Sequence, residues 1–408
     1  MSLIKQIDFN PANQSAFGTL ETAELTPIFQ GDFVYGLNTQ LWDTAVTSGT
    51  GATVDTDSSR LRIQSGTSST GYAYIQSKRP VRYRAGEGTV ARFTPLFSSG
   101  IADNTQIWGI FSITSNLPYD GYGFGYNGTS FGIVHYIRGN PTWYARSTDW
   151  NGDKVDGSAG SSFTWDPTKG TPVQIKYPFL GYGDILFYVQ HPTTGAWVLV
   201  HTIRYANTVA TTQLANPSLK FLGFTLNSGN TTNKTMYCAS VGLFTSGIRS
   251  FTGNPRWGMD NNKSGITTET NIITIKNCTS YNGVPNRGLI RLSFLSAASS
   301  AASGVSVFRF KINATLGGSP SYTTINGTSA DGGATITSGN SIASYDTAGT
   351  TVTGGTYIGG IVIDNPDTSS TDLEKYELFI APGDTLTISG FSTVSSAIGV
   401  GINWSEDI

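Results

Sequence analysis

Residues 121–134, Gly-Tyr-Gly-Phe-Gly-Tyr-Asn-Gly-Thr-Ser-Phe-Gly-Ile-Val, decide the fold of this chain. Aromatic residues alternate with glycines up to Asn127-Gly128, and apolar residues resume afterwards at Phe131 and Ile133. Asn-Gly between two runs of period two is a strong hairpin signal, because a type I′ turn needs a positive φ at both central residues. The stretch therefore predicts a β-hairpin with structural positions at Gly123, Gly125, Asn127 and Gly128.

The glycines of this hairpin leave bare backbone on one face, where we expect another sheet, a ligand or a neighbouring subunit to approach closely. Residues Gly123–Gly128 also match the pattern GxGxxG. A dinucleotide-binding fingerprint needs a helix after its glycines, whereas strand residues follow here. The glycines are therefore interpreted as packing positions, and the stretch supplies neither a nucleophile nor a general base.

Charge is scarce along the whole sequence. Charged residues make up 13% of the chain, and glycine occupies 49 of 408 positions, against about 25% and about 7% in ordinary soluble domains. The formal net charge of −2 argues against the broad basic surface on which duplex nucleic acid binding depends. We therefore expect no nucleic-acid partner and a weakly charged, hydrogen-bonding surface suited to a dense assembly or an extracellular setting.

The N-terminal residues lack the apolar core of a secretory signal, and no apolar run reaches transmembrane length. The expectation is a chain made in a cytoplasm, without a membrane partner. Cys238 and Cys278 show no CxxC spacing, so no cysteine-based zinc site is expected. Whether the two cysteines are free or joined stays open at this point.

Strand patterns recur along the chain, while no long window keeps a helical period. Asp184–Gln190 and Trp197–Ile203 are nearly continuous apolar runs separated by Pro192–Gly195, which predicts a second hairpin. Short strands between turns of Gly, Pro, Asn and Asp indicate β-sandwich or barrel architecture. We expect an all-β chain with an extended N-terminal arm over residues 1–30 and β-sandwiches over residues 31–250 and 251–408.

Four aromatic residues lie among polar residues rather than in apolar runs: Trp143, Tyr144, Trp150 and Trp165. An aromatic face beside amides and carboxylates is suited to stacking on a sugar ring and binding its hydroxyls. Subunit interfaces are also enriched in Trp and Tyr. Carbohydrate binding and subunit contact therefore remain equal alternatives for these four residues.

A loop over residues 149–157 is the most metal-like stretch, with oxygen ligands at Asp149, Asn151, Asp153 and Asp156. Calcium prefers such ligands, but the loop lacks the glycine and glutamate of an EF-hand. An Asx-rich turn explains the pattern better, so no metal and no other cofactor is expected.

Histidine and carboxylate chemistry is equally unspecific. His191 and His201 would be neighbours across the second hairpin, where Asp184 could join them in a metal or acid–base site, but no motif supports it. Glycoside hydrolysis needs two carboxylates held about 5–10 Å apart, and the acids of the first sandwich show no such pattern. No catalytic residue is predicted.

Several strings resemble modules in the virion structural proteins of tailed phages and large DNA viruses. They include Tyr83–Thr94, Asn104–Gly109, Gly123–Ile133 and the ending Ile402–Ile408. The resemblance implies lectin-like or jelly-roll sandwiches, the first over residues 31–250 and the second over residues 251–408. It also implies a homo-oligomer on a capsid, fibre or tail, and carries over no catalytic residue.

The leading hypothesis is therefore a non-enzymatic virion structural protein, assembled in a host cytoplasm as a homo-oligomer, with a trimer favoured, beside other virion proteins. The alternative is a carbohydrate-binding receptor module that attaches to host-surface glycans. A tailspike-type glycosidase ranks below both.

Overall fold

The computed structural model of the chain describes residues 25–246, 254–325, 327–330, 335–339, 341–364, 366–376 and 378–408. It divides into two units, Met1–Arg249 and Ser250–Ile408, beside the boundary at 250/251 that the sequence suggested. The regular elements of the described residues are all strands, apart from one 3₁₀ turn at Glu374–Tyr376. The predicted all-β class is confirmed.

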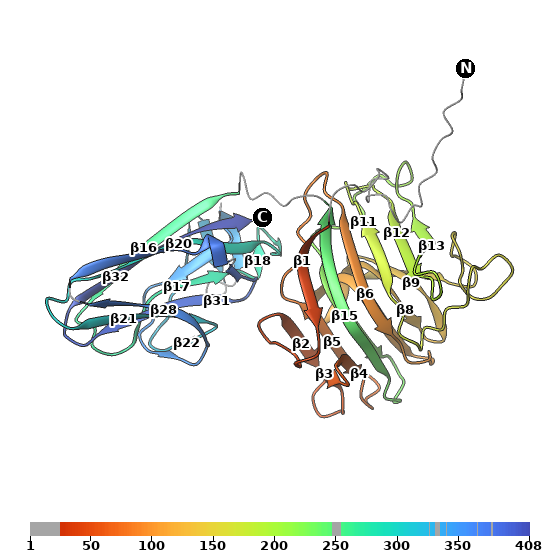
Figure 1. The fold of residues 1–408 in the computed structure, drawn as a ribbon, viewed down its shortest axis with the longest axis horizontal. Coiled ribbons are helices and arrows are strands. Elements are labelled where there is room, and N and C mark those ends of the chain that lie inside the picture. Colours follow the sequence, from red (N-terminus) through yellow and green to blue (C-terminus); the bar gives the residue numbers. More distant parts are fainter. Residues whose placement is uncertain are drawn as a thin grey trace, which may run out of the picture. The chain divides into compact units, whose positions relative to one another are not determined.

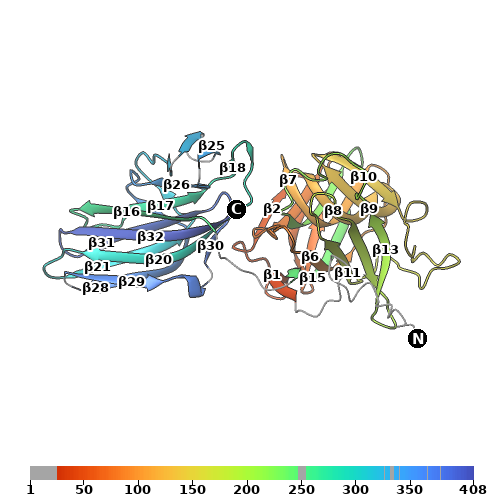
Figure 2. The same cartoon turned by 90° about the horizontal axis from the view of Figure 1, so that it is seen from above.

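Unit 1 is a sandwich of two antiparallel sheets, which lie one behind the other in Figure 1 and one above the other in Figure 2. The eight-stranded sheet has the order β13 (Trp197–Ile203), β12 (Ile185–Gln190), β11 (Val173–Tyr177), β6 (Thr89–Leu96), β15 (Thr235–Ser246), β4 (Arg60–Gln64) and β3 (Thr53–Asp57), with β1 (Leu25–Asp32) also paired to β15. The seven-stranded sheet has the order β10 (Asn140–Ala145), β9 (Ser130–Ile137), β8 (Leu117–Asn127), β7 (Asn104–Thr114), β14 (Lys220–Asn227), β5 (Tyr72–Ser77) and β2 (Trp42–Val46).

Large aromatic side chains fill the space between these sheets. Phe93 of β6 contacts Phe221 of β14 across the sandwich, with ring centroids 5.6 Å apart. Phe221 in turn stacks on Trp108 of β7 at 5.8 Å. All three rings are buried. The inward-facing apolar residues of the two sheets therefore build the core that the sequence pattern predicted.

The hairpin at residues 121–134 is present as β8 and β9, but its turn lies one residue later than predicted. Asn127 pairs with Ser130, so Gly128 and Thr129 are the central residues. Of these two only Gly128 has a positive φ, 60°, as a type II′ turn requires of its first position. Contact between the rings of Tyr126 and Phe131, with centroids 5.0 Å apart, explains the register, because paired aromatics on one face hold it.

The sequence predicted that another sheet, a ligand or a subunit would approach the glycine face of β8. This face is instead covered from within its own sheet. A Cβ atom built on Gly123 would lie 2.8 Å from Cε2 of Phe111, whose ring therefore covers this backbone from the neighbouring strand β7. Phe111 belongs to a small second core on the outer face of the seven-stranded sheet, with Ile107, Val134, Leu222 and Phe224.

The predicted N-terminal arm over residues 1–30 lies outside the described residues as far as residue 24. Residues 25–30 form most of β1, which pairs with β15. Ile28 and Phe29 are only 6% and 5% exposed. Burial of these apolar side chains explains why this part of the sequence joins the sheet.

Unit 2 contains two larger sheets. One has the order β16 (Arg256–Ser264), β32 (Ala397–Asp407), β20 (Leu289–Ser299) and β29 (Asp367–Asp372), with β30 (Phe379–Ile380) on β20. The other has the order β23 (Thr323–Thr324), β26 (Ala343–Asp346), β17 (Thr270–Asn277), β31 (Thr385–Ser392), β21 (Val305–Ile312) and β28 (Thr356–Asp364). Shorter pairings join β18 (Ser280–Tyr281), β19 (Val284–Pro285), β24 (Gly327–Ala330) and β25 (Thr335–Gly339), and separately β22 (Thr315–Leu316) and β27 (Val352–Thr353).

The apolar faces of the two larger sheets share a core that includes Phe308, Ile402 and Trp404. Both cysteines are free and buried, Cys238 in unit 1 and Cys278 in unit 2. Burial raises the pKa of both thiols, that of Cys238 to about 12, so both stay protonated and behave as packing residues.

Candidate functional site

The four predicted sugar-binding aromatics do not form one surface. Trp143 and Tyr144 are consecutive residues of β10, so their side chains point to opposite faces of the sheet. Trp143 pairs with Val134 and lies half-buried on the outer second core, whereas Tyr144 pairs with Ile133 and packs on the main core.

Trp150 and Trp165 were expected at the surface and are instead buried, at 4% and 3% exposure. Trp150 donates its indole N–H to the carbonyl of Tyr144 at 3.0 Å, and Trp165 packs edge-on against Phe131 with centroids 5.0 Å apart. The polar residues around these tryptophans form turns over the core, which explains why their sequence surroundings suggested exposure.

The acidic loop that suggested calcium uses its side chains to cap these turns. Carboxylate oxygens of Asp149, Asp153 and Asp156 accept backbone N–H groups of Ala145, Val155, Ser162 and Ser158. Hydrogen bonds from Ser158 lower the pKa of Asp156 to about 2. Asn151 instead binds both backbone groups of Thr202. Among the described residues no group of three His, Cys, Asp or Glu side chains is arranged to hold a metal ion.

His191 and His201 are not neighbours across the β12–β13 hairpin, although the hairpin itself is confirmed. His201 pairs with Phe187, four residues before His191, and His191 accepts hydrogen bonds within the turn, from the N–H groups of Thr193 and Thr194. Asp184 accepts the backbone N–H of Tyr205. The register therefore separates the three groups that the sequence had suggested as a site.

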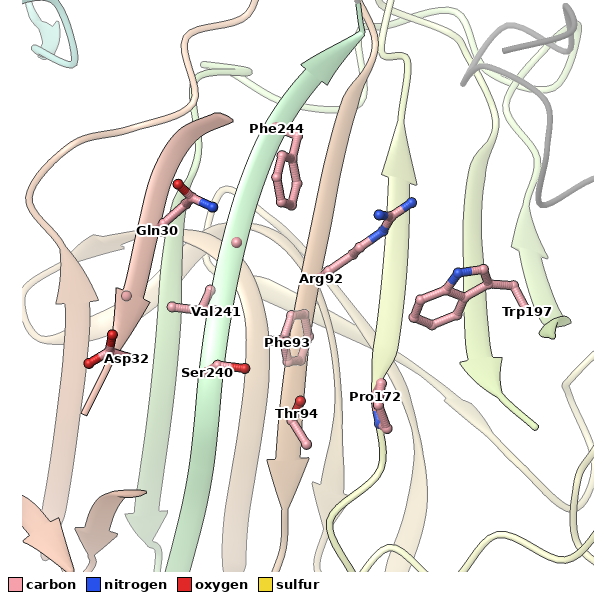
Figure 3. Close-up of a pocket in the computed structure, with 12 residues that line it drawn as sticks. Gln30, Asp32, Arg92, Phe93, Thr94, Pro172, Trp197, Ser240, Val241 and Phe244 are labelled. Carbon is pink, nitrogen blue, oxygen red and sulfur yellow. The ribbon is translucent and has the colours of Figure 1, made fainter. Parts of the chain in front are cut away.

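A concave feature of unit 1 lies elsewhere, on the outer face of the eight-stranded sheet (Figure 3). It is an open groove of about 450 Å³. Strands β1, β6, β13 and β15 and the residue before β11 line it, and we call it the outer groove: Gln30, Gly31, Asp32, Arg92, Phe93, Thr94, Pro172, Trp197, Ser240, Val241, Gly242 and Phe244.

Strand register places a row of residues across the floor of the outer groove. Gln30 pairs with Gly242, Gly242 with Arg92, and Arg92 with Gln174. Directly paired residues of antiparallel strands share one face of the sheet. Four strands therefore present these residues side by side on the outer face of the sheet.

Two aromatic rings flank the guanidinium of Arg92. It lies over the rings of Trp197 and Phe244, 5.7 and 5.8 Å from their centroids, within the range of cation–π attraction. Nε of Arg92 donates to Oε1 of Gln174 at 2.7 Å, which sets the plane of the guanidinium. Figure 3 shows the Trp197 ring directed towards Arg92 from across the sheet.

The opposite side of the groove is polar. Gln30, Asp32 and Ser240 are exposed there. Gly242 brings the Phe244 ring down onto the sheet, because a Cβ atom at this position would lie 2.7 Å from Cε2 and Cζ of that ring. Amide, carboxylate and hydroxyl groups thus face aromatic and guanidinium planes across one groove.

No sequence pattern predicts this site, because no two of its central residues are near in sequence. Arg92, Trp197 and Phe244 come from three strands, and only the strand order brings them together. The sequence carries one indication of the site. Arg92 is the one charged residue of the strand Thr89–Leu96, and it lies at an outward-facing position.

No family model and no curated protein matches the sequence. Solved structures do resemble part of the chain. The carbohydrate recognition domain of Emp47p is 11% identical with a TM-score of 0.35, covering 55% of this chain and 98% of its own. The exoplasmic/lumenal domain of VIP36, in a form bound to Ca²⁺ and Man3GlcNAc, is 12% identical with a TM-score of 0.34, covering 56% and 93%. A legume lectin-like domain from Entamoeba histolytica is 11% identical with a TM-score of 0.32, covering 54% and 98%.

Likenesses at such low identity and TM-score assign no function to the chain. A function for the outer groove follows only from this chain's own residues. The predicted resemblance to virion proteins finds no support among these neighbours. No helix in the described part of the chain is long and apolar enough to cross a membrane.

Proposed function

We propose that unit 1 is a carbohydrate-binding module and that its ligand lies in the outer groove. The observation that carries the proposal is the Trp197–Arg92–Phe244 arrangement facing Gln30 and Asp32. A pyranose ring has one apolar C–H face and a rim of hydroxyls. Such a ring fits a site where aromatic planes supply apolar contact and a few convergent polar groups supply hydrogen bonds.

Each polar group of the groove has a role that suits hydroxyls. The Asp32 carboxylate accepts hydrogen bonds, the Gln30 amide both donates and accepts, and a guanidinium donates in a fixed plane. Arg92 and Asp32 carry opposite charges, so the groove has no excess of one sign. These properties support a neutral glycan better than a phosphate or an acidic ligand.

An open groove also supports binding without chemistry. Among the described residues that line it, the only carboxylate is that of Asp32, whereas glycoside hydrolysis uses a facing pair. The absence of enzymatic activity nevertheless stays a prediction. A place on a virus particle, with homo-oligomers and other virion proteins as partners, rests on the sequence resemblance alone and likewise stays a prediction.

A glycan array tests the proposal with the full chain and two matched variants. Wild type should bind at least one class of neutral glycan, and Arg92→Lys should weaken that binding about tenfold, because lysine keeps the charge and loses the planar fork. Arg62→Lys, on β4 outside the groove, should bind as wild type does. Failure of wild type to bind any glycan would remove the proposal, and equal binding by Arg92→Lys would remove the outer groove as its site.

A further inference from the structure

Edge strands of the sheets are protected in different ways against pairing with another strand. Strand β28 of unit 2 lacks such protection. β28 is the last strand of the six-stranded sheet, as Figure 2 shows, and pairs only with β21 among the described residues. Its sequence, Thr-Tyr-Ile-Gly-Gly-Ile-Val-Ile-Asp, has one charge, on Asp364 at its end. Tyr357 and Val362 are 61% and 67% exposed. Long apolar edges of this kind are templates for pairing with another strand.

Other edge strands carry the devices that normally block such pairing. The edge of β13 is covered by the chain's own loop, because Gly152 and Asp153 donate their N–H groups to the carbonyls of Val200 and Leu199 at 3.1 and 3.0 Å. Strand β29 begins and ends with aspartate. Strand β16 carries the charged residues Arg256 and Asp260 on its exposed face, and β10 contains Pro141.

The geometry of β28 leaves a regular segment for a partner. Its one irregularity is a bulge at Ile358, where Phe310 pairs with Gly359 and Lys311 with Tyr357. Residues Gly359–Asp364 follow without interruption. Six regular residues are an ordinary strand length.

Both faces of this segment are apolar. On the outer face Val362 pairs with Val307, which pairs with Phe391, so an apolar row reaches the edge of the sheet. On the inner face Ile361 and Ile363 contact the core of unit 2. An added strand would continue the apolar row on one side and the core on the other.

We propose that this edge is occupied by β28 of a second copy of the chain, in antiparallel pairing about a twofold axis. The charge pattern selects this occupant and direction. In antiparallel pairing each Asp364 lies beside the uncharged start of the other strand, whereas parallel pairing would place the two carboxylates side by side. A twofold interface needs one self-complementary patch, and Gly360–Asp364, centred on Val362, is such a patch.

Sedimentation equilibrium of the full chain tests the pairing. Wild type should form a dimer whose fraction rises with concentration. Val362→Lys should weaken dimerisation about tenfold or more, because each copy loses apolar contact and gains a like charge at the junction. Ser370→Lys on β29 adds the same charge to an exposed edge position of the other sheet and should leave the dimer intact. Wild type that stays monomeric, or a Val362→Lys dimer equal to wild type, would overturn the proposal.

Disulfide trapping tests the direction independently of affinity. Both native cysteines are buried, so oxidation reports on an introduced cysteine. Val362→Cys should cross-link the two copies, since positions near the twofold axis approach within disulfide reach. Asp364→Cys should not, because antiparallel pairing separates the two copies of this residue by roughly 14–20 Å. Cross-linking of Asp364→Cys, or of neither variant, would overturn antiparallel self-pairing.

Discussion

Glycine and aromatic residues determine the interior of unit 1 together. Gly223 of β14 pairs with Trp108 of β7, and the six-membered ring of Trp108 occupies the place where a side chain at residue 223 would begin. Trp108 is fully buried and stacks on Phe221. Because Gly223 has no Cβ atom, the large side chain of Trp108 on the neighbouring strand fits into the core.

Gly223→Ala should destabilise unit 1 by about 1–3 kcal/mol, the usual effect of overpacking a close-packed core. Gly170→Ala is the control, because Gly170 is exposed and its Cβ atom would have its nearest neighbour, Cγ2 of Thr94, at 4.0 Å. The control should shift the free energy of unfolding by no more than about 0.5 kcal/mol. Urea unfolding followed by tryptophan fluorescence measures both, and equal stabilities would contradict the packing argument.

Single residues were also where sequence reasoning failed most clearly. Trp150 and Trp165 were expected at the surface because their neighbours are Asn, Asp, Gly and Thr. Those neighbours form capped turns, and the tryptophans fill the end of the core beneath them. The residue types around a tryptophan indicate whether the loop backbone is exposed to solvent. They do not indicate the direction in which the tryptophan side chain points.

At the scale of elements, one buried histidine joins a loop to a strand. The N–H of Asn151 donates to Nδ1 of His201 on β13 at 3.3 Å, so this histidine is neutral with its proton on Nε2. Burial lowers the pKa of His201 to about 4, and burial does the same to His135, which hydrogen-bonds the hydroxyl of Tyr205. Both therefore stay neutral in the folded chain at a pH where they would be charged in the unfolded chain.

Unit 1 should consequently lose stability as the pH falls from 6.5 towards 4. Below the unfolded-state pKa of about 6.5 the unfolded chain binds protons that the folded chain rejects, which amounts to about 2 kcal/mol per histidine at pH 5. Urea unfolding at pH 7.5 and pH 5.0 measures this loss. His201→Gln should reduce the loss by about 2 kcal/mol, because the histidine whose pKa differs between the folded and the unfolded chain is then absent. An identical loss in wild type and His201→Gln would show that this histidine is not held neutral.

Hairpins were the elements that the sequence predicted best, because their signals are local. The β8–β9 and β12–β13 hairpins are both present, and the turn error of one residue at Asn127 arose from the contact between Tyr126 and Phe131 beside the turn. The outer groove shows the limit of the method. Its residues come together only through the order β13-β12-β11-β6-β15, which no local pattern encodes.

At the scale of the whole molecule, the two units carry separate proposals. The outer groove of unit 1 is proposed to bind a neutral glycan, and the β28 edge of unit 2 is proposed to pair with a second copy. A twofold edge gives a dimer, whereas the sequence resemblance favoured a trimer, and sedimentation distinguishes the two. Pairing through unit 2 would place two glycan sites in one dimer. Binding through both sites would raise the avidity for a glycan-bearing surface without any new glycan contact.

Isothermal titration with the best glycan from the array tests the central claim most directly, using two tryptophan variants. Trp197 lines the outer groove, and Trp143 lies half-buried on the outer face of the seven-stranded sheet. Trp197→Ala should weaken binding about tenfold, corresponding to the loss of one aromatic contact, while Trp143→Ala should change the Kd by no more than about twofold. The reverse result, with binding lost in Trp143→Ala and kept in Trp197→Ala, would contradict the outer groove as the carbohydrate site.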